Sequence, residues 1–373
     1  MTAGWSAEVV GDLQGFRRLA GEWAHLYDRT PTATPFQSHA WLTSWWEHYG
    51  SRGGLRVVFV RRDGEPVAAG PFSTRRVAGV TTLRALGGDI SDVSDVLAVD
   101  SPEARQQLVA ALLDLPGWDV VDLPEVRPGT TAHSLVRLWP GTVQCVPASV
   151  MLELPGQPID VLMGTLDRSA AKSLRRRLRR NEALDLEVRA IPGEEVADAL
   201  RRLLHLHARQ WAGRGMTPEH GRSRFLGHLV SAVPRMLGEG QAIMLEYRLD
   251  GRLLISSLHL VGRDMVGGYL DGVAPEARQR LDIAAATLRE ELRLTVELGR
   301  PVYSMLRGEE SYKYRLEPLV VRNERLLLVR PGSVRGELVA WAAVQRAAAI
   351  CLAKQRAPWL RDVRGRVLAI IPH

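Results

Sequence analysis

The sequence predicts an α/β protein made of two related domains, each with a mixed, mostly antiparallel sheet flanked by helices. Two observations lead to this fold class. In each half of the chain, two β-rich runs are joined by Asp-Gly, a dipeptide that favours tight hairpin turns. The elements that follow each hairpin also come in one order, a strand, a helix and a strand, which indicates an internal duplication.

The first copy of this pattern lies in the N-terminal half. Asp63-Gly64 joins the two β-rich runs, and the next strand ends at Gly87-Gly88. A later helix starts with Pro102, which is well tolerated in a first helical turn. The expected elements are hairpin strands at 55–62 and 66–72, a strand at 80–86, a helix at 102–114 and a strand at 119–123.

The second copy repeats this order in the C-terminal half. Asp250-Gly251 joins its hairpin, and its helix stops at Gly299, a natural C-cap. The string Pro-Glu-Ala-Arg-Gln occurs in both copies, starting at Pro102 and at Pro275. The expected elements are hairpin strands at 242–248 and 253–260, a strand at 265–270, a helix at 284–298 and a strand at 301–306.

A turn-rich break at Leu154–Pro158 separates the two copies. We therefore expect an N-terminal domain at residues 1–155 and a C-terminal domain at 156–335. The remaining residues, 336–373, begin with an Ala-rich stretch of helical period, which we expect to pack across the body of the protein.

Composition places the chain among ordinary globular proteins. It has 46% hydrophobic and 24% charged residues, and its two cysteines exclude a disulfide framework and a cysteine-based zinc site. The N-terminus lacks the pattern of a secretory signal. The longest apolar stretch, 337–353, is interrupted by Gln345 and Arg346 and is interpreted as too short to span a bilayer. We expect a cytoplasmic protein without stable membrane insertion.

A net charge of +7 suggests an anionic partner. Much of the excess lies in one predicted helix, where Leu174 and Leu178 form a thin apolar stripe. Its basic face is either simply solvated or a docking surface for phosphates, those of a small ligand or of a nucleic-acid backbone. The basic residues are Arg168, Lys172, Arg175, Arg176, Arg177, Arg179 and Arg180.

The most informative segment is Leu306–Arg315, where ionisable and aromatic side chains directly follow an apolar strand. Strand ends are where open α/β proteins usually place their chemistry. The segment reads L-R-G-E-E-S-Y-K-Y-R and resembles the L-R-G-[DE]-E-x-Y-K-x-[RK] signature of the CelD/BcsL-like acyltransferases, a branch of the GNAT superfamily. A second block, Thr34–Ser38 followed by Trp41, Trp45 and Trp46, resembles that family's N-terminal T-P-F-Q-S…W…W-W pattern.

The resemblance covers about Trp23 to about Arg330 and implies a tandem GNAT-like architecture. It implies acetyl-CoA or another acyl-CoA as co-substrate, with no metal, lying where the central strands splay apart. The pyrophosphate is expected at the start of the helix at 284–298, where backbone N–H groups favour anions. The expected cofactor-binding residues are Arg278, Arg280 and Ala284. The family's S-P-G at this helix start is replaced by Asp282-Ile283-Ala284, and an Asp N-cap stabilises the helix but repels phosphate.

Acyl transfer to an amine needs the neutral amine, whereas a free alkyl ammonium has a pKa of roughly 10. A nearby carboxylate can take the proton as general base, and Glu309 and Glu310 are the available pair. Tyr312 suits an acid that protonates the leaving group, and Lys313 and Arg307 can hold the second carboxylate or an acidic substrate. The alternative is an ion-pair lattice around a turn, without a catalytic role.

Further candidates lie on or next to the strands that precede the helix expected at 284–298. Tyr269, Asp271 and His259 are expected to bind substrate, together with Arg307. His205 and His207 point to different faces of a helix, which argues against a shared metal ion. The chain has no H-E-x-x-H, P-loop or G-x-S-x-G motif, which argues against zinc hydrolysis, nucleotide hydrolysis and α/β-hydrolase chemistry.

The leading hypothesis is an acyl-CoA-dependent N- or O-acyltransferase with one competent site, in the second domain. Its acceptor is a small-molecule amine or hydroxyl, and family analogy points to a cell-envelope or polysaccharide precursor. One alternative keeps the fold but takes aminoacyl-tRNA as donor, as a Fem-like transferase does. The other is a catalytically inactive binding protein of the same fold.

Overall fold

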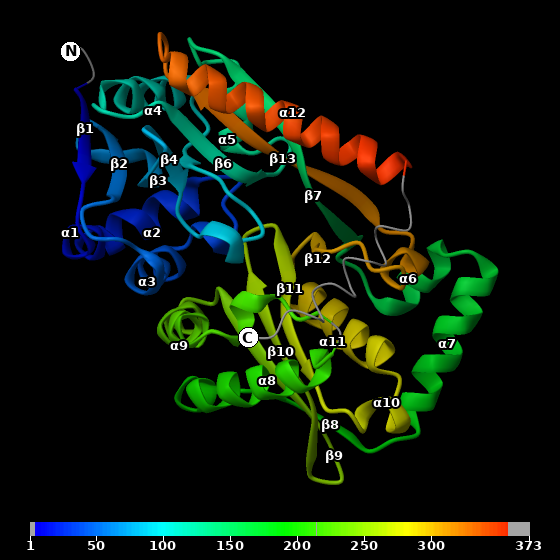
Figure 1. The fold of residues 1–373 in the computed structure, drawn as a ribbon. Coiled ribbons are helices and arrows are strands. Elements are labelled where there is room, and N and C mark those ends of the chain that lie inside the picture. The colour runs from blue at the N-terminus through cyan, green and yellow to red at the C-terminus, as the bar shows by residue number, and fades with distance from the viewer. Residues whose placement is uncertain (1–3, 214, 357–373) are drawn as a thin grey trace. The chain divides into compact units, whose positions relative to one another are not determined.

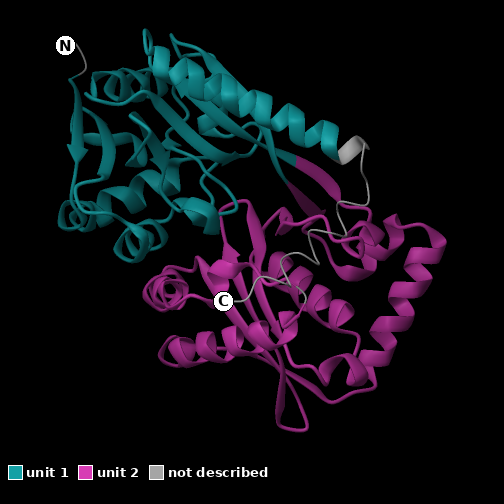
Figure 2. Ribbon diagram, in the orientation of Figure 1, with its two compact units in different colours: residues 1–149, 322–363 teal, residues 150–321, 364–373 magenta. Residues whose placement is uncertain are grey.

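The computed structural model describes residues 4–213 and 215–356, which fold into two compact α/β units (Figure 1, Figure 2). Unit 1 contains the described residues up to Ser149 and those from Arg322 through α12, and unit 2 contains Val150–Val321. The chain passes between the units within two strands, β7 (Val143–Pro155) and β13 (Leu319–Val329). The predicted α/β class with mixed sheets is confirmed.

This division differs from the sequence boundaries, because residues 322–335 lie in unit 1. The reason is strand pairing: β13 pairs antiparallel with β6 (Val120–Val126), from Leu326 opposite Leu123 to Val329 opposite Val120. Local composition does not reveal a partner so distant in the chain. The boundary expected near residue 155 falls inside β7.

Unit 1 has the strand order β1-β2-β3-β4-β6-β13, antiparallel except for the β4–β6 pair. Its further strands are β1 (Trp5–Val10), β2 (Leu55–Arg62), β3 (Glu65–Val77), β4 (Val80–Ala85) and the short β5 (Leu97–Ala98). Its helices are α1 (Leu13–Arg18), α2 (Ala20–Arg29), α3 (His39–Tyr49), α4 (Pro102–Asp114), α5 (Thr131–Leu135) and α12 (Val334–Arg356).

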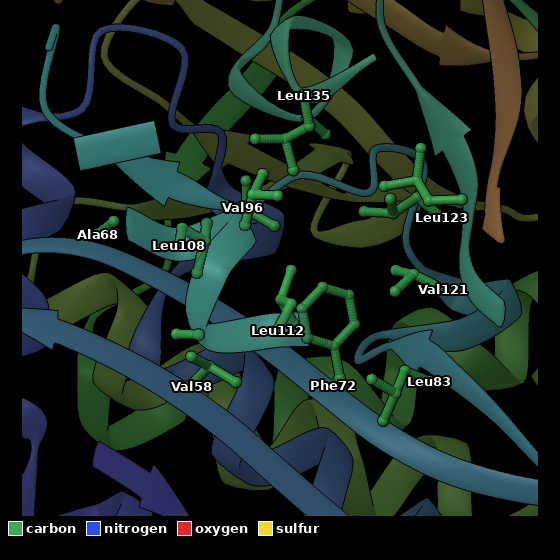
Figure 3. Packing of buried hydrophobic residues seen from close by; sticks show 14 of the residues in the cluster. Val58, Ala68, Phe72, Leu83, Val96, Leu108, Leu112, Val121, Leu123 and Leu135 are labelled. Atoms are coloured by element: carbon green, nitrogen blue, oxygen red, sulfur yellow. The ribbon is translucent and has the colours of Figure 1, made fainter. Parts of the chain in front are cut away.

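Helices cover both faces of the unit 1 sheet. Leu108 and Leu112 of α4 pack in a cluster with Val58 and Phe72 from β2 and β3 (Figure 3). The next residue of β2, Phe59, points the other way and stacks on Trp23 of α2, with the ring centroids 6.1 Å apart. Trp41 is fully buried, in agreement with the packing that the helical spacing of the tryptophans indicates.

Unit 2 has the strand order β7-β12-β11-β10-β9-β8. Its further strands are β8 (Leu186–Ala190), β9 (Ala242–Leu249), β10 (Arg252–Val261), β11 (Met265–Val273) and β12 (Val302–Arg307). Its helices are α6 (Ile159–Thr165), α7 (Arg168–Glu182), α8 (Val196–Trp211), α9 (Ser223–Gly238), α10 (Ala277–Arg280) and α11 (Ile283–Glu297).

Both predicted hairpins are present, and their turns explain the two Asp-Gly pairs. Asp63 and Gly64 have φ of 51° and 86°, and Asp250 and Gly251 have φ of 51° and 71°. Two successive positive φ angles define the turn whose twist matches that of paired strands, and Asp-Gly adopts them at low cost. The duplication of hairpin, strand, helix and strand is therefore present in the fold.

In unit 2 the central parallel strands separate after a short contact. β11 and β12 pair only from Met265 opposite Val302 to Gly267 opposite Ser304. Beyond this point β11 continues beside β10, with a bulge at Tyr269, and β12 keeps only its pairing with β7, as far as Arg307 opposite Met151. This divergence is the one that the resemblance implies, and it leaves the last part of β11 without β12 as a neighbour.

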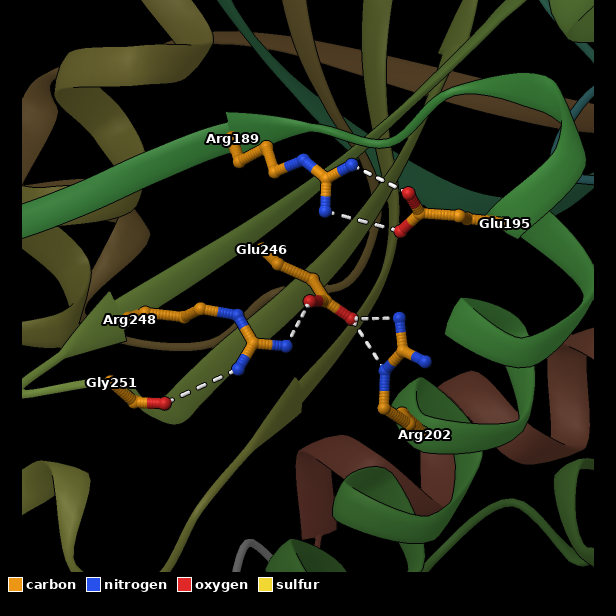
Figure 4. A network of polar contacts seen from close by, with 6 residues as sticks. All are labelled: Arg189, Glu195, Arg202, Glu246, Arg248 and Gly251. Atoms are coloured by element: carbon orange, nitrogen blue, oxygen red, sulfur yellow. Dashed lines mark hydrogen bonds and ion pairs between the residues drawn. The ribbon is translucent and has the colours of Figure 1, made fainter.

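The opposite face of this sheet, under α8, is held by ion pairs (Figure 4). Glu246 of β9 is 1% exposed and accepts hydrogen bonds from Arg202 of α8 at 2.7 Å and from Arg248 at 2.8 Å. Arg189 of β8 forms a bidentate pair with Glu195 at 3.1 and 2.6 Å. A buried carboxylate needs such partners, so this network serves the fold.

The C-terminal helix α12 corrects one expectation. The sequence interpretation took this apolar stretch as too short to span a bilayer, but Val334–Ala353 is a 20-residue helix that is long and apolar enough by length and composition. Within this helix, only 11% of the 18-residue window that passes the hydropathy test is buried. The residues of the expected tail beyond Arg356 lie outside the described part of the chain.

Candidate functional site

The predicted signature forms the exit of β12 and the short turn that follows. Leu306 and Gly308 both have positive φ, 50° and 138°, and a side chain at Gly308 would meet the Glu310 carboxylate at 2.6 Å. Glu309 and Glu310 are exposed. Glu309 accepts a hydrogen bond from the Tyr314 hydroxyl at 3.2 Å, and Glu310 pairs with Lys313 at 2.8 Å. Part of the expected ion-pair lattice is therefore present.

Lys313 turns from this segment into the protein. Its side chain is 10% exposed, and Nζ donates to the carbonyl oxygen of Met305 at 3.2 Å. Its positive charge lowers the pKa of two carboxyl groups on other elements, Asp271 of β11 and Glu291 of α11. Lys313 thus connects the signature to a pair of acids inside unit 2.

The two acids differ in access to solvent. Glu291 is 7% exposed, and burial raises its pKa well above the ordinary value, with the negative charge of Asp271 adding to the effect. Protein also surrounds Asp271 closely enough for burial to raise its pKa, yet the residue is exposed by its surface area. Because its surface is exposed, solvent reaches Asp271. Because burial and the negative charge of Asp271 both raise the pKa of Glu291, Glu291 is the acid that stays protonated when Asp271 ionises.

Two tyrosines complete the polar cluster. The Tyr303 hydroxyl of β12 donates to Glu291, and burial raises the pKa of this tyrosine well above its usual range. Tyr312 is 52% exposed, so burial affects it less than it affects Tyr303, but burial and the carboxylates of Glu310, Asp271 and Glu291 also raise its pKa. Both phenols therefore stay protonated and able to donate.

Glycine makes room for this cluster on β11. A Cβ at Gly268 would lie 2.6 Å from the Tyr303 hydroxyl and 3.8 Å from Oε1 of Glu291. Any larger residue would push the phenol away from the glutamate. The Gly267-Gly268 pair of β11 thus lets β12 and α11 bring polar groups against the sheet.

His259 lies on the same face of the sheet, because it pairs with Gly268 across the β10–β11 ladder. It is fully buried, and neither ring nitrogen has a hydrogen-bond partner among the described residues. Burial lowers its pKa to about 4, so the imidazole is neutral at physiological pH. Ser257 pairs with Asp271 in the same ladder, which places Asp271 on this face too.

A pair of histidines reaches Asp271 from the other side. Nδ1 of His207 lies 2.7 Å from the Asp271 carbonyl oxygen, and its Nε2 lies 3.1 Å from Nδ1 of His220. Because a carbonyl only accepts, His207 carries its proton on Nδ1, and His220 donates to it. Burial lowers the pKa of both rings, that of His220 to about 4, so both imidazoles are neutral at physiological pH.

The expected cofactor loop has its helix start already capped. Asp282 accepts from the backbone N–H of Ala285 at 3.0 Å, and Asn181 of α7 bonds to both its N–H and its carbonyl, at 2.9 and 2.8 Å. Arg280 pairs with Asp250, Arg278 is exposed, and Ala284 lies in the first turn of α11. The prediction of an Asp N-cap at this helix start is confirmed.

The basic segment is the helix α7, as expected. Leu174, Leu178 and Asn181 face inward, and the charged side chains surround this stripe. Of the seven basic residues, all but Arg177 are exposed. Arg180 donates to the carbonyl of Gln279, so the C-terminal end of α7 lies beside α10.

Unit 1 buries acids of its own among its described residues, including Asp95 and Asp122. Its buried carboxylate Asp95 is held by backbone N–H groups of Ala132 at 2.6 Å and Val96 at 2.8 Å, and by the Thr32 hydroxyl at 3.0 Å. Arg52 is one of the residues that line a surface recess of about 360 Å³, and none of the predicted site residues lines it. The scaffold role of unit 1 stays a prediction.

The structure thus gathers Asp271, Lys313 and Tyr312 around residues that sequence reasoning missed. Glu291 was missed although it lies three residues after Leu288 and four before Thr295, on the buried face of α11. His207 was weighed only with His205, while its real neighbour His220 lies 13 residues away. Arg307 ends β12 opposite Met151, and its charge lowers the pKa of His220.

Comparisons with known proteins find a family similarity within the C-terminal unit. Residues 168–314 match the model of the acetyltransferase (GNAT) domain, and this match lies wholly within unit 2. No curated protein matches the chain. Within the described residues, no group of three or more His, Cys, Asp or Glu side chains is arranged to hold a metal ion.

Solved structures share the whole architecture at low identity. The structure of FemX has a TM-score of 0.59 at 12% identity, covering 86% of this chain and 96% of its own. A conserved protein of unknown function from Bacteroides thetaiotaomicron VPI-5482 scores 0.58 at 10%, covering 87% and 100%. L-PGS from Bacillus licheniformis scores 0.51 at 13%, covering 87% and 96%. The chain therefore shares its fold with FemX and these other structures.

Proposed function

We propose that the chain is an acyltransferase whose reaction centre is Asp271 with Lys313, Glu291 and the two tyrosines. The observation that carries this proposal is a solvent-reached carboxylate of raised pKa, placed where β11 and β12 diverge. The GNAT match over residues 168–314 supports the reaction class. Raised carboxylate basicity is what a general base needs near neutral pH.

In the proposed reaction, the acceptor amine or hydroxyl gives its proton to Asp271 as its nitrogen or oxygen attacks the acyl carbonyl carbon. The bond from that carbon to the leaving atom then breaks. Tyr312, whose phenol stays protonated, is placed to donate to the leaving group. The charge of Lys313 favours the ionised form of Asp271, while burial keeps Glu291 protonated, so one acid acts as base and the other stays neutral.

Glu309 and Glu310 stay candidates for the base, but the geometry favours Asp271. Both glutamates are exposed, and Glu310 is engaged by Lys313. Asp271 lies on β11, where the pairing with Ser257 of β10 fixes its backbone, and its charge interacts with those of Lys313 and Glu291. In this proposal Glu310 positions Lys313, and Glu309 orients the Tyr314 side chain.

We propose acyl-CoA as donor and a small amine or hydroxyl, or a cell-envelope or polysaccharide precursor, as acceptor in the cytoplasm. The family analogy of the signature supports this choice. A second donor, aminoacyl-tRNA, is favoured by one observation: Asp282 and Asn181 already satisfy the start of α11, where a CoA pyrophosphate would otherwise dock. The exposed basic face of α7 and the fold likeness to FemX agree with that alternative.

The test compares Asp271→Asn with Glu309→Gln and Glu310→Gln. Turnover is measured as thiol release from acetyl-CoA with a panel of amines and alcohols, and as transfer from aminoacyl-tRNA. We expect Asp271→Asn to lose roughly 10²-fold or more in turnover and to melt no earlier than the parent chain. Full activity in Asp271→Asn, with loss in either glutamate variant, would return the base to the signature.

The donor is identified separately by melting temperature. A donor that binds the folded chain raises the melting temperature in proportion to its saturation, so acetyl-CoA and aminoacyl-tRNA are compared at matched excess over their binding constants. Binding of tRNA should also weaken steeply with salt, since counterions are released from its phosphates. An unchanged melting temperature with both donors would support the inactive binding protein instead.

A further inference from the structure

One face of α12 packs on unit 1. Gly336 and Ala340 are buried, and Ala340 joins a cluster with Val120, Leu327 and Val329. A side chain at Gly336 would meet the Asp119 carbonyl oxygen at 2.6 Å. This close contact therefore holds the N-terminal half of the helix against the sheet.

The opposite face of α12 is apolar and open. Val334 is 73% exposed, Leu338 62%, Trp341 62% and Leu352 50%. These residues recur at spacings of three and four, with Gln345 and Ala348 between them, so they form one stripe along the helix. The buried positions 336 and 340 and the partly buried position 343 fall on the other side. A stripe of this kind on an otherwise folded protein marks an interaction surface.

Much of the net charge of the chain belongs, by sequence, to α12 and the residues that follow it. Residues 334–373 contain seven basic and two acidic residues, a net charge of +5 within a total of +7. The acidic residues are Glu337 and Asp362, and the basic ones are Arg335, Arg346, Lys354, Arg356, Arg361, Arg364 and Arg366. Of these, Arg335 and Arg346 lie on the described part of α12, and both are exposed.

We propose that the exposed face of α12 docks the protein on an anionic lipid surface. Apolar side chains with a tryptophan enter the boundary between headgroups and acyl chains, and basic residues pair with lipid phosphates. A second copy of the chain is the less favoured occupant, because it would bring another charge of +5 against the first. Since Gly336 and Ala340 stay packed on unit 1, the helix lies along the surface and does not cross it.

This inference is independent of the acyl-transfer proposal, because α12 contributes no residue to the reaction centre. The experiment uses the full chain with sedimented vesicles of phosphatidylcholine, alone or with a quarter of phosphatidylglycerol. We expect binding to the anionic vesicles, weak binding to the neutral ones, and release at high salt. The double variant Leu338→Glu, Trp341→Glu should bind at least tenfold more weakly.

The matched control is Val77→Glu, which places one acidic residue on another exposed apolar position of unit 1, 58% exposed. It should bind vesicles as the parent does. Circular dichroism and melting temperature check that all variants fold, and gel filtration with light scattering gives their mass. A double variant that binds as well as the parent overturns the proposal.

Two further outcomes also decide against a lipid partner. A parent chain that ignores vesicles but is dimeric, and becomes monomeric in the double variant, shows that a second copy covers the stripe. A parent that is monomeric and binds neither vesicle type overturns the proposal as well. Loss of binding that is confined to the double variant supports it.

Discussion

Units 1 and 2 order their strands alike but fill the space beneath their main helix differently. In unit 1, α4 presents Leu108 and Leu112 to the hydrocarbon side chains of Phe72 and its neighbours. In unit 2, α11 presents Glu291 to Tyr303, on a sheet face that also carries Asp271 and His259. One architecture thus supports a close-packed core in one copy and a titratable cluster in the other.

The difference shows where the cost of function is placed. Buried acids and an unpartnered histidine destabilise a fold, since burial penalises their charged forms and leaves polar atoms unsatisfied. Unit 1 also buries an acid, Asp95, and burial raises the pKa of this carboxyl to about 7, although three donors hold it. Unit 2 tolerates the cost around Asp271, which supports its assignment as the reactive copy.

The largest effect is expected from the core of unit 1. Phe72→Ala removes a fully buried ring and should lower the free energy of unfolding by about 3–5 kcal/mol, measured by denaturant titration. Turnover per folded molecule should stay unchanged if unit 1 is a scaffold. Phe72→Leu, which keeps most of the volume, is the milder control. A folded Phe72→Ala chain with lost turnover would mean that the interior of unit 1 takes part in the reaction.

The next effect distinguishes the units by their response to acid. His259 has a pKa lowered to about 4, so the stability that depends on its neutral ring is present above its unfolded pKa, near 6.5, and is lost as pH falls through 4. Over that window the loss is about 3 kcal/mol. His259→Gln should remove this loss, as measured by unfolding at pH 7 and pH 4.

The control for this prediction is His25→Gln on the exposed surface of unit 1. It should leave the difference between the two pH values unchanged. Equal pH dependence in the parent and in His259→Gln would show that the buried ring does not govern acid stability.

A smaller effect is expected at the glycine that makes room for the cluster. Gly268→Ala forces the Tyr303 hydroxyl away from Glu291 and should lower turnover roughly tenfold, equivalent to about 1.4 kcal/mol. Gly164→Ala in α6 is the matched control, because no atom lies within 4 Å of its added carbon. Unchanged activity in Gly268→Ala would separate Tyr303 from the reaction.

The smallest effect compares the two helix caps. Ser101 caps α4 through the N–H of Ala104 at 3.2 Å, and Asp282 caps α11 through that of Ala285. Ser101→Ala and Asp282→Ala should each cost about 1 kcal/mol of unfolding free energy. Asp282→Ser keeps the cap and removes the charge, so it should tighten acetyl-CoA binding in calorimetry. Unchanged affinity would favour a donor that docks elsewhere.

Sequence reasoning predicted the elements well where local chemistry determines them. The Asp-Gly turns fixed both hairpins, and the helix expected at 102–114 is α4 with the same bounds. The strand expected at 301–306 is β12, displaced by one residue. Each of these elements carries its own start or stop signal in the chain.

The site was predicted less completely, because its members come from separate elements. Lys313 and Asp271 were found from the signature and from a strand end. Glu291 sits beside Glu290, and composition does not tell which of the two faces the sheet until the helix phase is known. The His207–His220 contact depends on how α8 and the turn after it pack, which no sequence spacing encodes.

The late return of β13 to unit 1 has a consequence for synthesis of the protein on the ribosome. Asp122 of β6 can form its bidentate ion pair only after Arg325, 203 residues later in the chain, has been synthesised. A nascent chain can complete unit 2 while the edge of β6 is still bare, and bare edges recruit other chains. Truncation before Arg322 should therefore yield aggregates, and a chaperone that shields this edge during translation should raise the yield of native protein.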